Sequence, residues 1–322
     1  MFAIPAFALP SGPAPGRTDA TMWDGSRSRR IVVRGNGFTV LECTRRQEAG
    51  TPCPCSGQGI AARALIVTSG LFRHGASPPR ALLTPGAMLF GETLCECDLE
   101  PIDGDIGTLL AFEYSDSYLE AVRDSMRSIC PPLLSSRHRL DRLDAGPAIA
   151  YLPASKHSVS VYARAARMAR DARVIDADND ANARDTALAV FDTASRTAAT
   201  TRVQERIAPD LEARIAGALR HVERHHSDDC SLDALAAEAR LGVFHFLRSF
   251  KRCVGQTPCQ YVMAVRLREA ADLLASSDAR VLDIAIQSGF GDLSHFNASF
   301  REAFGVQPSA YRKTYRSERI AA

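Results

Sequence analysis

The sequence predicts an α+β protein in which an N-terminal antiparallel β barrel, a helical linker region and a C-terminal all-α domain with two helix-turn-helix motifs follow one another. Residues 30–115 carry short β-type apolar runs bounded by Gly, Pro or charged clusters, whereas from residue 116 onward apolar residues recur at helical spacing. Near the C-terminus the same helical pattern occurs twice. With 322 residues, 46% of them hydrophobic, the chain is long enough for two domains that each bury a core.

The first 29 residues predict a disordered tail, since they are rich in Pro, Gly and Ser. The opening MFAIPAFALPSGPAPG has no basic leader and is broken by prolines, which argues against a signal peptide. No run approaches the ~18 apolar residues of a membrane span. We therefore expect a cytoplasmic protein without a membrane partner, in which the nine cysteines are mostly reduced.

Seven short runs with strand character fill the next region, and Pro85-Gly86 predicts a turn between two of them. Many short strands at close spacing are typical of a small antiparallel barrel or sandwich. The predicted strands are residues 31–33, 38–43, 64–68, 81–83, 88–90, 94–98 and 108–114.

The cysteines of this region are a candidate chemical site. Cys95 and Cys97 lie two apart on a predicted strand and so share one face, Cys53 and Cys55 lie in a predicted loop, and Cys43 ends another strand. Together such thiolates could hold Zn²⁺ or a soft metal, or form a redox disulfide. Neither pair has the C-x-x-C spacing of a zinc ribbon. Small apolar fillers in a reduced protein are the alternative interpretation.

Helical periodicity replaces the strand pattern at residue 116. The sequence predicts helices over residues 116–129, 159–172 and 185–195, with the polar stretch 175–185 as a loop. We interpret residues 116–207 as a helical linker and dimerisation region and expect a homodimer. A further helix over residues 210–226 then opens the C-terminal domain, residues 208–322.

Two units of one design make up that domain. Each is a helix, a tight turn containing Gly, and a second helix, an arrangement that can place its second helix in a DNA major groove. The second helices, residues 243–252 and 292–304, carry inward-facing stripes of Phe246 and Phe250 and of Phe296, Phe300 and Phe304.

One longer helix separates the units. Pro258 suits the first position of a helix, and about nineteen residues at ~1.5 Å per residue make a rod of roughly 28 Å. Adjacent major grooves on one side of B-DNA recur about every 34 Å. A rigid rod of this length could hold two recognition helices about one helical turn apart.

The stretches GQTPCQYVMAVRLREAADLL and DIAIQSGFGDLSHFNASFREAFGVQPSAYR closely resemble the AraC/XylS family of transcription regulators, and the resemblance runs from roughly Asp210 to Arg316. In the order of its elements, residues 65–115 resemble the cupin-like sensor domains that precede this module in many members. The resemblance implies a cupin-like effector-sensing domain over residues 30–115 and double-stranded operator DNA as partner. It also implies a small-molecule effector of unknown identity, and RNA polymerase as a partner if the protein is an activator.

The family's base-reading positions fall on matched residues of the two second helices. Arg248 could form a bidentate contact to guanine, Asn297 could pair with adenine, and Leu247 or Leu293 could pack on a thymine methyl. Contact of Arg248 with phosphate alone is the alternative. The predicted DNA-contacting residues are Phe244, Leu247, Arg248, Lys251, Leu293, Ser294, Asn297, Ala298 and Arg301.

Two features depart from the family. Gly242 and Gly291 stand where a Ser or Asp commonly caps each second helix, which costs a few tenths of a kcal/mol, and both second helices are poorer in polar groups than is usual. His245 and His295 repeat at equivalent places, and we expect each to be half-buried and bonded to local backbone or phosphate.

The charge balance, 39 Lys and Arg against 37 Asp and Glu, argues against extensive non-specific binding of nucleic acid. We predict no catalytic residue and no cofactor. A metal-dependent cupin oxygenase would need two or three His with a carboxylate, and the strand region holds only His74. A thiol-transfer repair enzyme would need a nucleophile motif that we do not find. An architectural DNA protein would have no use for a separate β domain.

Overall fold

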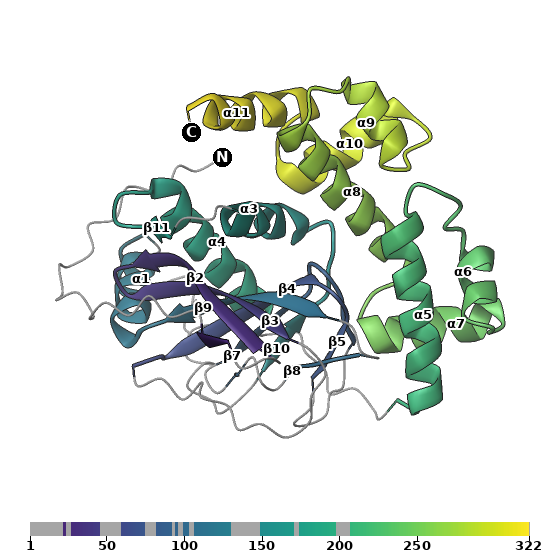
Figure 1. The fold of residues 1–322 in the computed structure, drawn as a ribbon, viewed down its shortest axis with the longest axis horizontal. Helices are drawn as coiled ribbons and strands as arrows, with labels where there is room; N and C mark the ends of the chain where they lie inside the picture. The colour runs from purple at the N-terminus through teal and green to yellow at the C-terminus, as the bar shows by residue number, and fades with distance from the viewer. Residues whose placement is uncertain are drawn as a thin grey trace.

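The computed structural model describes residues 22–23, 27–45, 59–74, 82–91, 94–95, 99–102, 106–129, 149–170, 174–197 and 207–321. Figure 1 shows a twisted sheet with helices over one face, and the C-terminal helices in an arc along one side of it. The predicted β-rich N-terminal region and all-α C-terminal region are confirmed, whereas two short strands, Ala150–Leu152 and Ile175–Asp176, lie among the helices between them.

The strands form two sheets. The larger has the order β1-β2-β3-β9-β4-β7-β10, with β11 pairing in parallel with β2, and the smaller has the order β6-β5-β8. The strands are β1 (Met22–Trp23), β2 (Arg27–Gly35), β3 (Phe38–Arg45), β4 (Ala62–Ser69), β5 (Phe72–His74), β6 (Leu82–Leu83), β7 (Met88–Gly91), β8 (Leu99–Pro101), β9 (Gly107–Tyr114), β10 (Ala150–Leu152) and β11 (Ile175–Asp176).

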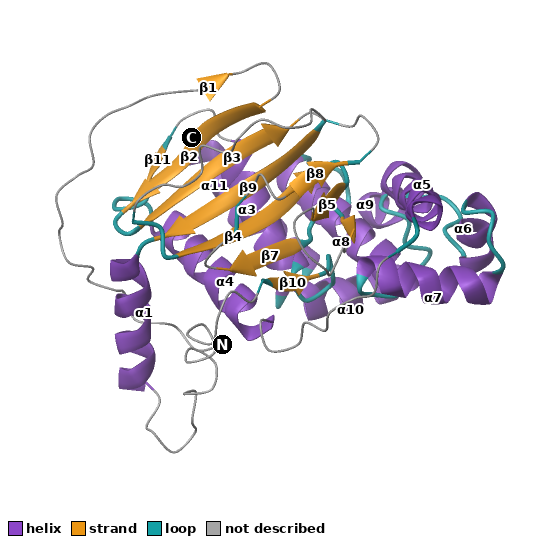
Figure 2. Cartoon of the chain, turned by 90° about the horizontal axis from the view of Figure 1, so that it is seen from below, coloured by secondary structure: helices purple, strands orange, loops and turns teal. Residues whose placement is uncertain are grey.

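The described strands do not form the predicted closed cupin-like barrel. Strands β1 and β10, at the two ends of the larger sheet, do not pair with each other. The first six residues of β4 are buried in succession, so both faces of this sheet are covered. On one face Ile66 and Phe112 pack against helices α1 (Asp116–Ile129), α3 (Val159–Arg170) and α4 (Ala181–Thr197). On the other, Leu65 and Leu109 pack with Phe72 of the smaller sheet. Figure 2 shows the strands side by side with α3 and α4 behind them.

Helices α1, α3 and α4, expected to form a linker, thus supply one wall of the β domain's core. A role for them in a dimer interface stays a prediction. Tyr114 of β9 donates its hydroxyl to the Ala187 carbonyl of α4 at 2.9 Å, which ties the helix to the sheet.

Several local predictions need correction. Residues 22–23 and 27–29, predicted as tail, lie in β1 and β2, since the backbone pairs with β2 and β3 there. The predicted loop over residues 175–185 contains β11, and α4 begins at Ala181 because Asp180 Oδ1 accepts from the N–H groups of Asn182 and Ala183. Strands β5, β8 and β10 are too short to produce a recognisable alternation in the sequence.

Seven helices form the C-terminal domain, and all four helices predicted for its two units are confirmed. No helix within the described residues is long and apolar enough to cross a membrane. The helices are α5 (Pro209–His225), α6 (Leu232–Glu238), α7 (Val243–Val254), α8 (Pro258–Ser276), α9 (Val281–Gln287), α10 (Leu293–Phe304) and α11 (Pro308–Ala321).

Two separate cores hold these helices, and α8 contributes to both. Its first half places Tyr261 and Val265 in a core with α5, α6 and α7, whereas its second half places Leu267 and Leu274 in a core with α9, α10 and α11. Each core extends into the N-terminal part: the first includes Leu82 of the smaller sheet, and the second includes Val159 of α3. Both halves of the C-terminal domain therefore pack directly against the β domain.

Candidate nucleic-acid interface

The first helix-turn-helix unit consists of α6 and α7. Ser231 caps α6 by accepting from the Ala234 N–H at 3.3 Å. The turn places Arg240 at φ 53°, the one non-Gly residue with positive φ among the described residues. Gly242, at φ −66°, is the N-cap of α7 and provides no side-chain acceptor. The predicted weak cap on this helix is confirmed, but the left-handed residue of the turn is Arg240 rather than a Gly.

The second unit, α9 and α10, repeats this backbone with one change. Gly289 has φ +87° and donates to the Ile286 carbonyl, as Arg240 donates to the carbonyl of Ala237 in the first unit. The segment between this turn and the following helix is one residue longer, so the N-cap of α10 is Asp292. The prediction that Gly291 occupies the cap is therefore wrong.

Asp292 is a strong cap. Its Oδ2 accepts from the His295 N–H at 2.8 Å, and its Oδ1 accepts from the Ser294 N–H at 3.1 Å. These two backbone hydrogen bonds hold the pKa of the carboxyl below its ordinary value. His295 itself is exposed, as is His245, so the expectation of half-buried histidines is wrong.

Helix α8 joins the units as a rigid rod. It has 19 residues, and a capping box between Thr257 and Gln260 begins it. At ~1.5 Å per residue its length is about 28 Å. Arg266 near its middle donates to the His226 carbonyl at 2.8 Å, which fixes the end of α5 against the rod.

The buried faces of α7 and α10 share a pair of phenylalanines at equivalent positions. Phe246 and Phe250 have ring centroids 5.5 Å apart, Phe296 and Phe300 have centroids 5.6 Å apart, and all four side chains are fully buried. The faces opposite these stripes are available for contact. This is the orientation that the sequence predicts.

The nine predicted DNA-contacting residues all lie on α7 and α10. Six of their side chains are exposed and three are half-buried. Phe244 is 82% exposed, so its ring is available for contact. Leu293 packs in part against the second core, so less of it is available than predicted. The exposed residues are Phe244, Arg248, Lys251, Ser294, Ala298 and Arg301, and the half-buried ones are Leu247, Leu293 and Asn297.

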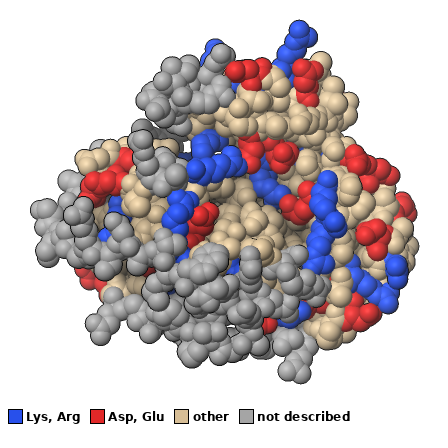
Figure 3. All heavy atoms as spheres, viewed as in Figure 1, with Lys and Arg blue, Asp and Glu red and all other residues tan. Residues whose placement is uncertain are grey.

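The two faces differ in charge. The last turn of α7 carries Lys251 and Arg252, whereas that of α10 carries Arg301 beside Glu302. Lys156 of the β domain contacts Glu302 at 2.5 Å, and this hydrogen bond holds the pKa of the carboxyl below its ordinary value. On the face seen in Figure 3, Lys and Arg side chains are interspersed with Asp and Glu over the C-terminal helices.

The β domain holds each unit by specific contacts. In the first, Arg73 Nε donates to Oε1 of the buried Glu212 at 2.6 Å, and the Tyr151 hydroxyl donates to the Val254 carbonyl at the end of α7 at 2.9 Å. The sequence offers no signal for these long-range pairs, because Arg73 and Glu212 are 139 residues apart.

The second unit is held through α3. Arg170 and Asp272 approach to 2.5 Å, and Arg167 donates to the Tyr311 hydroxyl at 2.8 Å. The Arg167 guanidinium also lies 3.3 Å from the centroid of the Tyr315 ring, a cation–π contact. In sequence these arginines are ordinary polar positions of an Ala-rich helix.

The predicted thiol site is largely untested by the structure, since Cys53, Cys55 and Cys97 lie outside the described residues. Cys95 lies in a loop rather than on a strand, and the neighbouring Leu94 carbonyl accepts from the Arg63 side chain at 3.0 Å instead of from a paired strand. Cys43 is buried in the core between the two sheets. Within the described residues, no three His, Cys, Asp or Glu side chains are grouped to hold a metal.

Comparison with known proteins agrees with this geometry. A protein-family model described as a helix-turn-helix domain matches residues 235–314. Over 106 residues the chain is 36% identical to the HTH-type transcriptional activator RhaS of Klebsiella pneumoniae (strain 342). These matches agree with the resemblance of the C-terminal domain to AraC/XylS regulators. The match covers 33% of this chain and 38% of that protein, so the chain spans well under half the length of this relative.

Other relatives match the same AraC/XylS-type domain. RhaS of Escherichia coli (strain K12 / DH10B) is 37% identical over 92 residues, covering 29% of this chain and 33% of that protein. Among solved structures, the DNA-binding domain of AdpA in complex with a target DNA is 29% identical. That match covers 34% of this chain and 98% of the solved one, with a TM-score of 0.33.

Proposed function

We propose that this chain is a sequence-specific transcription regulator of the AraC/XylS type that lays α7 and α10 in adjacent major grooves of operator DNA. The observation that carries the proposal is the pair of equivalent units, each with a buried Phe stripe and an exposed opposite face, joined by one rod. A rod of about 28 Å compares with the groove repeat of about 34 Å.

In this proposal the two helices divide the work of reading and positioning. Arg248 of α7 makes a bidentate contact to guanine, and Asn297 of α10 pairs with adenine. Lys251 and Arg301 contact phosphates, which sets the register without reading sequence. Phe244, exposed on the first turn of α7, packs on a thymine methyl.

Activation is the mode of regulation that the relatives support, since RhaS is called a transcriptional activator. RNA polymerase is then a partner. The effector acts through the β domain, and a homodimer engages two copies of the operator half-site, which increases the effective affinity.

The experiment selects a binding site from random duplex DNA with the full chain and then measures three variants on it. Arg248→Ala and Asn297→Ala should each cost about 1–3 kcal/mol on the selected site and relax the preference at one base position. Lys251→Ala should weaken binding to all sequences alike and reduce the slope of affinity against salt.

Arg224→Ala is the matched control, because Arg224 is exposed on α5 and donates to the carbonyl of Arg220 in its own helix. It should leave both the affinity and the salt slope unchanged. A uniform loss from all three test variants would mean that a different face of these helices meets the DNA, and absence of any selected sequence would contradict the proposed function.

A further inference from the structure

The segment between β10 and α3 reaches the end of the second recognition helix. Lys156 Nζ lies 2.5 Å from Oε1 of Glu302, in the last turn of α10. Three residues further on, Val159 packs in one core with Phe296 and Phe300. Figure 1 shows α3 between the sheet and the helices of this unit. A charged residue of the β domain thus lies directly beside a helix that is proposed to read DNA.

Glu302 lies on the face of α10 that the proposed function places toward DNA. It follows Ala298 by four residues, and residues four apart on a helix are neighbours on one face. On α7 the equivalent residue is Arg252, four residues after Arg248. Both Arg252 and Glu302 are exposed. A carboxylate at this place repels phosphate where the first unit attracts it, so the second unit has a deficit of positive charge there.

Lys156 offsets this deficit from the β domain. An ammonium group has three N–H donors, and Glu302 is the acceptor that contacts this one among the described residues. The Lys156 side chain is 40% exposed, which leaves room for a second acceptor. Its turn is closed by the Ser155 N–H, which donates to the Ser158 hydroxyl at 3.0 Å. With the exposed Arg301, the end of α10 carries a positive group from each part of the chain.

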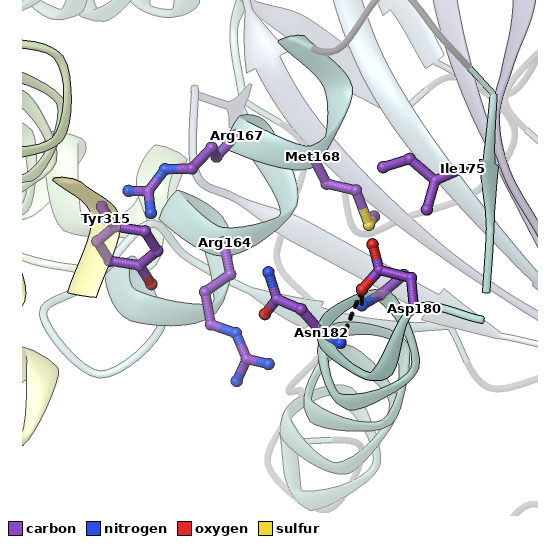
Figure 4. A pocket seen from close by; sticks show the side chains of 8 residues that line it. Arg164, Arg167, Met168, Ile175, Asp180, Asn182 and Tyr315 are labelled. Carbon is purple, nitrogen blue, oxygen red and sulfur yellow. Dashed lines mark hydrogen bonds between the residues drawn. The ribbon is translucent and has the colours of Figure 1, made fainter. Parts of the chain in front are cut away.

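Helix α3 holds the turn of Lys156 in place, because it is fixed to the second unit along its length. The Arg167 guanidinium lies 3.3 Å from the centroid of the Tyr315 ring. Figure 4 shows Arg167 of α3 reaching Tyr315 on α11. At the far end of α3, Arg170 pairs with Asp272 of α8 at 2.5 Å. The lysine is therefore positioned beside α10 before DNA binds, which reduces the entropy lost on binding.

We propose that Lys156 contacts a phosphate of the operator beside the groove that α10 occupies, so that the β domain forms part of the DNA interface. The proposal rests on the proposed function, since it needs α10 in a major groove. A lysine binds phosphate as a point charge, so this contact adds affinity without reading sequence. The sequence offers no signal for it, because Lys156 and Glu302 are 146 residues apart.

The test measures the affinity of the full chain for the site selected from random duplex DNA, over a range of salt concentrations. Lys156→Gln should weaken binding roughly five- to tenfold near 0.1 M salt and reduce the salt slope by about 0.9, the values for loss of one phosphate contact. The preference among base sequences should stay unchanged. Glu302→Gln should strengthen binding, because it removes a charge of the same sign as phosphate.

Arg170→Gln is the matched control. It also removes an ion pair between α3 and the C-terminal domain, but at the other end of a helix of 12 residues, about 18 Å away. It should leave the affinity and the salt slope unchanged. Equal losses from Arg170→Gln and Lys156→Gln would show that a looser contact between the two parts weakens binding, and would overturn the proposal. Circular dichroism shows whether each variant is folded.

The Glu302→Gln background separates contact from screening. A lysine that only neutralised Glu302 would have no effect on DNA affinity once residue 302 is uncharged. A direct contact to phosphate predicts that Lys156→Gln still weakens binding and still reduces the salt slope in that background. Loss of the effect there would overturn the proposal.

Methylphosphonate substitution, which removes the charge of one phosphate at a time, locates the contact. At one phosphate beside the groove of α10, the substitution should weaken the wild type and have little effect on Lys156→Gln. Absence of any such phosphate would overturn the proposal. Failure of the full chain to select a sequence would instead contradict the proposed function, whereas a selected site that Lys156→Gln binds as tightly as the wild type overturns this inference alone.

Discussion

The two helix-turn-helix units share buried Phe pairs and turn hydrogen bonds, and they differ in their exteriors. Phe246 and Phe296 occupy equivalent buried positions, and the turn hydrogen bonds of Arg240 and Gly289 are equivalent as well. Outside, α7 begins at an uncapped Gly242, whereas α10 begins at a doubly bonded Asp292 at a turn one residue longer. The interior fixes the fold of a unit and leaves its surface free to differ.

The surfaces differ in a way that bears on DNA. Equivalent positions on the two helices hold Phe244 and Ser294, Arg248 and Ala298, and Arg252 and Glu302. The first helix is therefore the more basic, and its exposed face begins with an aromatic ring where that of the second begins with a hydroxyl. We infer that the first unit supplies most of the attraction to phosphate, and that the second contributes directional contacts to bases.

The largest expected effect tests the equality of the interiors. Phe246→Ala and Phe296→Ala should each destabilise the full chain by about 3–5 kcal/mol, because each removes a fully buried ring from a packed core. Urea unfolding of both variants measures the cost.

Phe244→Ala, on the exposed face of the same helix, should change stability by less than about 0.5 kcal/mol and serves as the control. A loss of under about 1 kcal/mol in only one of the two core variants would show that the two interiors are not equivalent.

The second prediction concerns how the β domain holds each unit. Arg73→Gln removes the partner of Glu212, whose side chain is 4% exposed, and should cost about 2–3 kcal/mol because a buried carboxylate is left unpaired. Lys156→Gln removes a contact to the exposed Glu302 in the second unit and should leave the unfolding midpoint unchanged. Thermal unfolding measures both midpoints. Equal falls in the two variants would contradict the expected difference between the buried and the exposed contact.

Much of the C-terminal domain can be predicted from sequence, because its helices are set by local signals. The Phe stripes, Pro258 and the Thr257 cap all act within a few residues, and the predicted helices match the observed ones closely. One of the local errors, Gly291 for Asp292, arose because a single additional residue in the turn shifts the cap without disturbing the stripe.

The β domain is harder to predict, because its sheet is decided by long-range pairing. Strand β9 pairs with both β3 and β4, and α3 and α4 cover a face that the strand alternation alone leaves unassigned. A closed barrel and an open sheet show the same alternation of apolar and polar residues along each strand.

The third prediction compares the two turns. A Cβ added at Gly289 would lie 2.5 Å from the His226 carbonyl oxygen, and the residue has φ +87°. Gly289→Ala should therefore lower the free energy of unfolding by about 1–2 kcal/mol.

Arg240→Gly changes the equivalent turn position, which has φ 53°. Its free energy of unfolding should stay within about 1 kcal/mol of the wild type, because relief of a left-handed conformation offsets the entropy that Gly adds to the unfolded chain. Urea unfolding that ranked these two in the reverse order would contradict the equivalence of the turns.

The smallest expected effect concerns the caps. Gly242→Ser gives α7 an acceptor for its first N–H groups and should stabilise the chain by a few tenths of a kcal/mol at any pH between 3 and 8.

Asp292→Ala removes the side-chain acceptor at the start of α10 and should destabilise the chain at neutral pH. The folded pKa of Asp292 is lowered, so its contribution is present above the unfolded pKa of about 3.9 and is lost as the pH falls through the folded value. The deficit of Asp292→Ala should therefore shrink below about pH 4, while the gain of Gly242→Ser stays constant. Thermal midpoints of both variants from pH 3 to 8 provide the measurement. An Asp292→Ala deficit that did not change with pH would mean that packing rather than the charged cap distinguishes the start of α10 from that of α7.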